Sequence, residues 1–292
     1  MHYCYRYRKQ SGFVTDRFLA IKRNEPAMTR FRRYALCFCV FALVLAGCDS
    51  ASDDDDATPP ALIPAEAFSL QTDLFRQDGI PKTAVGLHFA AAALRVWPVS
   101  LIVGANLIIP VAVTGAALQA DPERNGNTWT WASTTVVNGQ DVTFALAATV
   151  QGAAVRWSAR VSLSDGQQTL DDFELYTALT DLASQTGSWQ LYYRIDGERR
   201  NVLNADFSVS GEMESTITYS IPASAERNAG DAVRYEVEGA ERVFFWTQVD
   251  EGQDHLVTWD AATRTGSITA TNYNDGQKAC WDENLDDDAC SD

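Results

Sequence analysis

Several residue patterns on which enzymes depend are missing from this sequence. It has three histidines, and it contains no Gly-x-Ser-x-Gly motif, no phosphate-binding loop and no His-Glu-x-x-His motif. Basic residues are also scarce, with 23 against 39 acidic ones, and the first 47 residues hold nine of the basic and two of the acidic side chains. The rest of the chain has 14 basic and 37 acidic residues, a net charge of −23. A nucleic-acid-binding surface needs a basic stripe, so that function is excluded.

Cysteine is rare too, and its positions are informative. Of six cysteines, three lie before residue 48, in a part that we expect to be removed, and the others are Cys48, Cys280 and Cys290. In an exported chain, the even pair Cys280 and Cys290 predicts a disulfide. Metal binding by this pair is the alternative, but the two histidines after residue 47, His88 and His255, are not at ligand spacing. We expect no metal, no cofactor and no catalytic residue.

The amino-terminal region has the pattern of an export signal. Residues 30–33 are Arg-Phe-Arg-Arg, residues 34–45 are apolar, and Ala46-Gly47 precede Cys48. The apolar run is too short to span a bilayer, which needs about 20 residues. Residues 45–48 resemble the lipobox of bacterial lipoproteins. This resemblance implies that Cys48 is acylated, for example with palmitate, and that the lipid bilayer is a partner. A cleaved signal with an incidental cysteine is the alternative.

The sequence predicts one folded domain behind this signal. Residues 1–27 have no evident role, and we interpret them as a start codon assigned too far upstream or as a cytoplasmic extension. Residues 28–47 form the lipoprotein signal peptide. Residues 48–60 form an acidic disordered tether, because they lack apolar side chains and their like charges repel one another. The domain then covers residues 61–292, with a helical insert at residues 81–120.

Most of this domain alternates between apolar and polar side chains, which is typical of strands with one buried face. The clearest alternating runs are residues 142–150, 153–163, 203–209, 213–221 and 233–237. Tight hairpin turns are predicted where the alternation breaks, at Asn138-Gly139, Asp165-Gly166, Asp196-Gly197 and Glu251-Gly252. We count about eleven strands with short connections. The predicted fold class is mainly β, a curved antiparallel meander sheet or incomplete barrel wrapped around an apolar helical segment.

The helical insert is almost free of charge. Residues 84–97 predict a helix that ends at Pro98, and the apolar residues 99–118 predict a second one. We expect this pair to be buried under the sheet, with Ile108 in the interior, because a helix that is apolar all round belongs in a core. Insertion of residues 99–118 into a membrane is the alternative.

Two polar side chains on the first helix share one face, because His88 and Arg95 are seven residues apart. They form either a polar stripe at the rim of the core or a polar pair at the mouth of a ligand cavity. Trp129 and Trp131 point the same way along a strand. They either fill the core or stack on sugars.

The carboxyl-terminal segment starts with Cys280-Trp281-Asp282 and ends near Cys290. We expect the disulfide to clamp this acidic tail, with Trp281 pinning it to the last strand. Together with the lipobox, the acidic tether and the Trp-rich sheet, this segment resembles a group of bacterial envelope lipoproteins. The resemblance implies no known activity.

The function expected from these features is that of a membrane-anchored bacterial envelope lipoprotein. It would hold an apolar ligand, a small molecule or a lipid, between helix and sheet, a geometry similar to that of the lipoprotein carriers of the bacterial envelope. The alternatives are a structural or partner-binding envelope protein without a cavity and, third, a glycan-active enzyme with paired carboxylates. The sequence does not indicate the protein partner or the membrane leaflet.

Overall fold

The computed structural model describes residues 58–62, 70–76, 85–164, 169–181, 183–211, 214–225 and 227–290. The chain divides into two units, Met1–Asp55 and Asp56–Asp292, and the described residues all belong to the second. The predicted signal peptide, the lipidation residue Cys48 and most of the tether therefore lie outside the described residues.

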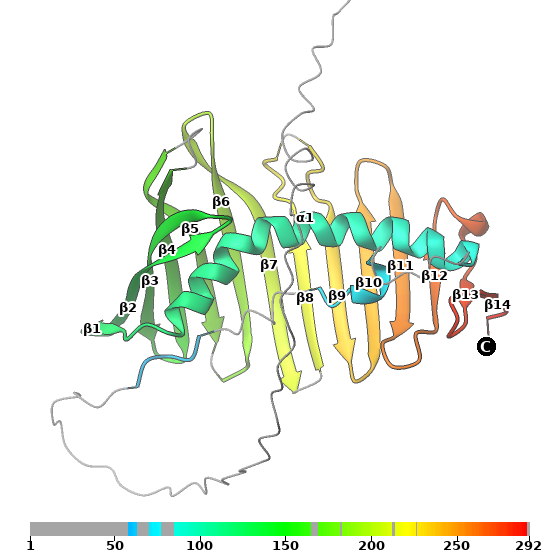
Figure 1. Ribbon diagram of the computed structural model, residues 1–292, viewed down its shortest axis with the longest axis horizontal. Helices are drawn as coiled ribbons and strands as arrows, with labels where there is room; N and C mark the ends of the chain where they lie inside the picture. Colours follow the sequence, from blue (N-terminus) through cyan, green and yellow to red (C-terminus); the bar gives the residue numbers. More distant parts are fainter. Residues whose placement is uncertain are drawn as a thin grey trace, which may run out of the picture. The chain divides into compact units, whose positions relative to one another are not determined.

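A single antiparallel sheet forms most of the described structure (Figure 1). Its fourteen strands pair in sequence order without a crossover, and the sheet does not close on itself. The predicted antiparallel meander is thus confirmed, although it has more strands than the eleven expected. The strands are β1 Glu123–Asn125, β2 Thr128–Val137, β3 Gln140–Gln151, β4 Ala154–Ser164, β5 Thr169–Asp181, β6 Thr186–Ile195, β7 Glu198–Gly211, β8 Glu214–Ser220, β9 Ala232–Glu238, β10 Glu241–Gln248, β11 Gln253–Asp260, β12 Gly266–Ala270, β13 Ala279–Trp281 and β14 Asp287–Asp288.

The alternation in sequence becomes one buried and one exposed face. In β3, for example, Val142 and Phe144 are buried while Thr143 between them is exposed. The hairpin turns follow the predicted chemistry, because Asn138-Gly139 and Asp196-Gly197 have positive φ at both residues, as the favoured two-residue turn requires. Asp165-Gly166 lies outside the described residues. Short turns between strands of matched length keep consecutive strands adjacent.

One long helix, α1 (Leu87–Ala117), crosses the sheet (Figure 1). At 1.5 Å per residue it is about 46 Å long. Its first turns pack against β11 to β14 and its last turns against β2 and β3. The predicted helix end at Pro98 was wrong, since the helix continues through both Pro98 and Pro110. Pro98 lies on the exposed face, where water can bond the carbonyl that loses its partner, so packing of the opposite face outweighs the cost of the proline.

The core lies between the inner face of α1 and the apolar face of the sheet. At one end, the ring of Phe75, in the short helix η2 (Asp73–Phe75), is 4.9 Å from that of Trp259 and 5.5 Å from that of Phe89. At the other end, the rings of Trp131 and Trp157 stack 6.1 Å apart. Trp131 therefore fills the core, which was the first of the two roles considered for it.

The outer face of α1 is exposed and apolar, which differs from the prediction of a wholly buried pair of helices. Ile108, which was expected in the interior, is 38% exposed, and Leu94 is 75% exposed. That prediction was wrong because a single helix crossing an open sheet can bury only the side that faces the sheet. The outer side has no second layer of the described residues above it.

Candidate functional site

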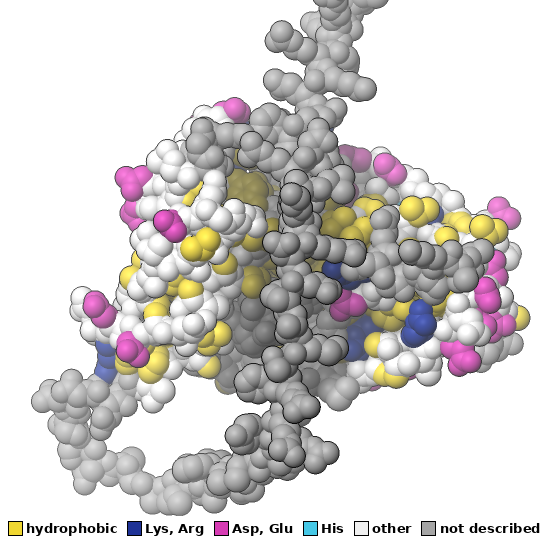
Figure 2. Space-filling model, viewed as in Figure 1, with side chains coloured by type: hydrophobic (Ala, Val, Ile, Leu, Met, Phe, Trp, Pro, Cys, Tyr) yellow, Lys and Arg dark blue, Asp and Glu magenta, His cyan; other side chains and the backbone are white. Residues whose placement is uncertain are grey.

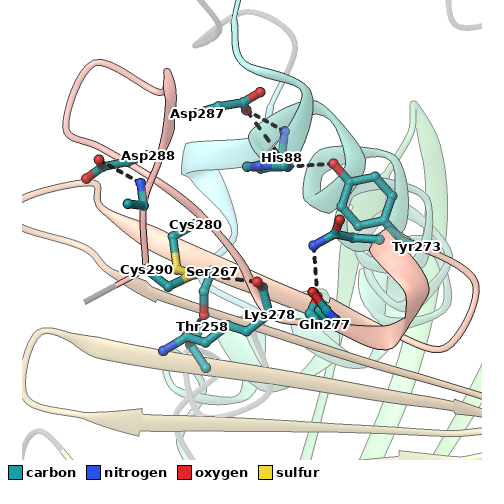
Figure 3. The surroundings of a disulfide bond; sticks show 12 residues. His88, Thr258, Ser267, Tyr273, Gln277, Lys278, Cys280, Asp287, Asp288 and Cys290 are labelled. Atoms are coloured by element: carbon teal, nitrogen blue, oxygen red, sulfur yellow. Dashed lines mark hydrogen bonds and ion pairs between the residues drawn. A yellow bond between two sulfur atoms is a disulfide. The ribbon is translucent and has the colours of Figure 1, made fainter. Parts of the chain in front are cut away.

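A disulfide closes the carboxyl-terminal segment at one end of α1 (Figure 3). It joins Cys280, in β13, to Cys290, with a Cα–Cα distance of 5.2 Å. The predicted pairing is thereby confirmed. Trp281 beside it is buried, and its indole N–H donates to the backbone oxygen of Arg264 at 2.8 Å. The expected attachment of the tail to the sheet thus involves both the disulfide and Trp281.

The disulfide loop, residues 280–290, caps the amino-terminal end of α1. The backbone N–H of Gly86 donates to the Leu285 carbonyl at 2.9 Å, and that of His88 donates to Asp287 Oδ1 at 2.8 Å. Gly86 itself has no side chain that could cap the helix, and a Cβ there would lie 2.4 Å from Asp287 Oδ1. Helix N-termini favour an acceptor of this kind, because their first N–H groups have no partner within the helix. A residue about 200 positions away supplies it here.

His88 and Arg95 share one face of α1, as predicted, and that face meets the sheet. His88 Nδ1 lies 2.7 Å from the hydroxyl of Tyr273, which Figure 3 shows on the side of His88 away from Asp287. The Arg95 guanidinium lies over the ring of Tyr273, 5.6 Å from its centroid, and donates to Asn272 Oδ1 at 2.6 Å. Neither His88 nor Arg95 lines the grooves or the small cavity along α1 that are described below. Their contacts favour the polar stripe at the rim of the core over the mouth of a ligand cavity.

His255 is the buried member of this polar network, a position that was not predicted from the sequence. It is 1% exposed; Arg95 Nε–H donates to its Nδ1 at 3.2 Å, and its Nε2 lies 2.9 Å from Gln248 Oε1. With Nδ1 accepting, the proton is on Nε2 and is donated to Gln248. A signal was available, because His255 alternates with the inward-facing Val257 and Trp259 of β11.

Burial and neighbouring charge set the protonation of this network. Burial lowers the pKa of His255, the Arg95 cation lowers it further, and the Asp254 carboxylate opposes both. A protonated imidazole would direct a second N–H at the guanidinium, so the neutral ring fits this position. Burial raises the pKa of the Tyr273 hydroxyl, and the Asp287 carboxylate adds to that effect. The Arg95 cation therefore binds the helix to the sheet by donating to two neutral acceptors, His255 and Asn272.

Three grooves lie along the middle of α1, because the helix packs most closely near its two ends. The η2 groove, between α1 and residues 70–76, has a volume of about 430 Å³. The β2–β6 groove has about 320 Å³ and the β7–β10 groove about 200 Å³. A smaller cavity of about 40 Å³ lies beneath the helix, among Leu107, Trp157 and Trp189. Side chains thus nearly fill the space directly beneath the helix, while open grooves lie along its sides.

The walls of these grooves are mainly apolar, with a few polar groups. The η2 groove is lined by Asp73 and Arg76 and by apolar side chains of α1 that include Ile108 and Val111. The β7–β10 groove includes the Asn106 side chain, which accepts a hydrogen bond from Tyr193 at 2.8 Å. Apolar walls with a small number of polar groups are typical of small-molecule sites, whose volumes run from about 300 to 1,000 Å³. The two larger grooves fall at the lower end of that range.

The described residues offer little for metal binding or for sugar stacking. They contain no cluster of three His, Cys, Asp or Glu side chains that could hold a metal ion. Trp131 is buried and Trp129 is partly buried, with the Arg124 guanidinium 5.4 Å from its ring centroid. These two tryptophans therefore form no exposed platform.

No protein-family model, no curated protein and no solved structure matches this chain.

Proposed function

We propose that this chain is a bacterial envelope lipoprotein that is anchored through acylated Cys48 and holds an apolar ligand along helix α1. The anchoring is supported by the basic, apolar and small residues that precede Cys48 in the sequence. Export to an oxidising compartment is compatible with the disulfide between Cys280 and Cys290. The bilayer, reached through the acyl chains, is the first partner.

The observation that carries the ligand proposal is the open η2 groove. Apolar side chains of α1 form one wall, and the groove also includes Trp97, Ser100 and the charged pair Asp73 and Arg76. An extended apolar chain fits such a groove better than a compact polar molecule does, because burying a polar group without a partner is costly. The ligand class is therefore an acyl chain or a similarly apolar small molecule.

Filling the groove tests this proposal. Gly104 lines the η2 groove, and a Cβ there would meet nothing within 4 Å, so Gly104→Phe adds a large side chain at the groove wall from a position with room for its Cβ. Gly115 is the matched control, because it is on the same helix, also has no atom within 4 Å and lines none of the grooves. Native mass spectrometry of protein purified from membranes should find a bound apolar molecule in the wild type and in Gly115→Phe, and much less in Gly104→Phe. Wild-type protein without any bound apolar molecule would contradict the ligand proposal.

Anchoring has a separate readout. Intact-mass analysis of the mature protein should find Cys48 as the first residue with added acyl mass. An unmodified cysteine in the mature chain would leave the groove proposal standing and refute the anchor.

A further inference from the structure

The outer face of α1 is an exposed apolar surface that extends beyond the proposed ligand grooves, since Leu87, Leu94 and Leu118 line none of them and only Leu101, Ile102 and Ile108 do. It consists of Leu87, Leu94, Leu101, Ile102, Ile108 and Leu118, whose exposed fractions run from 38% to 75%. Leu87, Leu94, Leu101 and Ile108 recur every seven residues, so they lie in a row about 32 Å long. In Figure 2, hydrophobic side chains are seen along parts of the course that α1 takes in Figure 1, and acidic side chains are more frequent toward the margins of that view.

This outer face has no charge. His88 and Arg95 are the two ionisable side chains of α1, and both are bonded to groups on the sheet side, to Tyr273, Asn272 and His255. Monomeric soluble proteins rarely expose a continuous apolar surface of this length, and such surfaces mark sites for membranes or for other proteins. We propose that the outer face of α1 lies on the surface of a lipid bilayer, with the helix axis in the plane of the membrane.

A bilayer fits this face better than a second copy of the chain. A helix that pairs with its own copy needs large apolar side chains at two positions of each seven-residue repeat, so that knobs fit into holes. Three residues beyond the leucine row stand Ala90, Trp97, Gly104 and Val111, which differ widely in size. Fluid acyl chains require no such match. Trp97 also suits the interface, where tryptophan is enriched.

Docking in the plane also fits the helix better than spanning does. By length and composition α1 could cross a membrane, but core helices of soluble proteins pass the same test. Its inner face is held by the sheet and its amino-terminal end by Leu285 and Asp287. Crossing the bilayer would break those contacts. An interfacial helix buries only one face, by about 5–10 Å, and the sheet can cover the other.

The anchor of the proposed function makes a weak docking surface sufficient. Fourteen positions separate Cys48 from Leu62, which packs against the core, a reach of at most about 50 Å, so the tether brings the domain to the bilayer without orienting it. Tethering raises the effective concentration of the surface near the membrane, so a modest affinity keeps it docked. The net charge of −23 beyond residue 47 means that apolar contact, not attraction to anionic lipid, drives this docking.

A fluorescent probe on the outer face tests the docking. Leu94→Cys, labelled with an environment-sensitive dye in the oxidised protein, places the probe on α1 away from the grooves. Val136→Cys is the matched control, because Val136 is apolar and 64% exposed on β2. In phosphatidylcholine vesicles that contain a quencher attached to the acyl chain, the dye at position 94 should be quenched several-fold more than the dye at position 136. Equal, weak quenching at the two positions would overturn the proposal.

Adding the vesicles to purified protein distinguishes docking through α1 from anchoring through the acyl chains of Cys48. Docking through α1 should be seen there whether or not Cys48 is acylated. Replacing Leu87 and Leu94 with glutamine should weaken vesicle binding roughly tenfold or more, since two largely exposed leucines would no longer be buried in lipid. The exposed pair Val136→Gln and Val249→Gln should leave it unchanged. If the dye at position 94 is not quenched and two copies of Leu94→Cys cross-link, this face belongs to a dimer interface and the bilayer proposal is rejected.

Discussion

His255 and Arg95 meet inside the protein as a neutral ring and a cation, and their contact makes the stability depend on pH. The folded state disfavours protonation of His255, while the unfolded chain binds a proton with the ordinary histidine pKa of about 6.5. Below that pH the unfolded state gains the proton and the folded state resists it. The stabilisation is therefore complete above about pH 6.5 and is lost as the pH falls toward the lowered pKa of the folded state.

Urea unfolding at pH 7.5 and pH 5.5 measures this effect. We expect the wild type to be less stable at pH 5.5, and His255→Gln to lose most of that difference because glutamine does not titrate. The carboxylates whose pKa values are lowered, Asp172, Asp181, Asp260 and Asp282, change protonation at more acidic pH and contribute little between these two values. An equal loss of stability in both proteins would exclude His255 as the cause.

Gly266 is a position where a single methyl group decides the packing. A Cβ there would lie 2.3 Å from Cζ2 of Trp281 and 2.4 Å from the Thr258 carbonyl oxygen. Gly266→Ala should therefore destabilise the protein by about 1–3 kcal/mol, because the indole and the neighbouring strand must move. The matched change Gly104→Ala, in open space on α1, should instead stabilise it by about 0.5–1 kcal/mol. The midpoints of urea unfolding compare the two, and equal midpoints would contradict the crowding at Gly266.

At the level of elements, α1 and the disulfide loop depend on each other. The loop supplies a carbonyl, a carboxylate and the buried Leu285 side chain to the first turn of the helix. Closing a loop of this size contributes about 2–3 kcal/mol in the chain-entropy model. Reduction of the disulfide should therefore lower the global stability and also loosen the start of α1, since the capping groups would no longer be held in place.

Hydrogen exchange on the double variant Cys280→Ser and Cys290→Ser tests this dependence. Amides in residues 88–95 should exchange faster than in the wild type, while those in residues 107–117, which pack near β2 and β3, act as an internal control. A uniform change along α1 would show that the disulfide stabilises the whole domain and not this end of the helix.

At the level of the whole molecule, the meander makes each strand a neighbour of the next, and the sheet remains open. Its two edge strands are short and charged: β1 is Glu-Arg-Asn and β14 is Asp-Asp. Short charged edges discourage pairing with other chains. The open sheet cannot bury a helix on all sides, which is why α1 has both an inner face in the core and an exposed outer face.

The elements that could be predicted from sequence are those set by local patterns. The alternation around Phe144 and the turn at Asn138-Gly139 depend on backbone geometry over a few residues, and both were confirmed. The disulfide followed from the small number of cysteines after the signal and was confirmed as well. The length of α1 could not be predicted, because the cost of a proline is local and the packing that offsets it is not.

The sequence by itself determined most of the strands, their order in the meander and the pairing of Cys280 with Cys290, because residue periodicity, turn chemistry and cysteine number require no knowledge of distant contacts. Only the tertiary structure decided which side of α1 is exposed, that Asp287 caps its first turn and that Arg95 meets His255. The two contacts join residues 199 and 160 positions apart in the chain. Such contacts arise when the sheet and helix pack together, and no local pattern of residues specifies them.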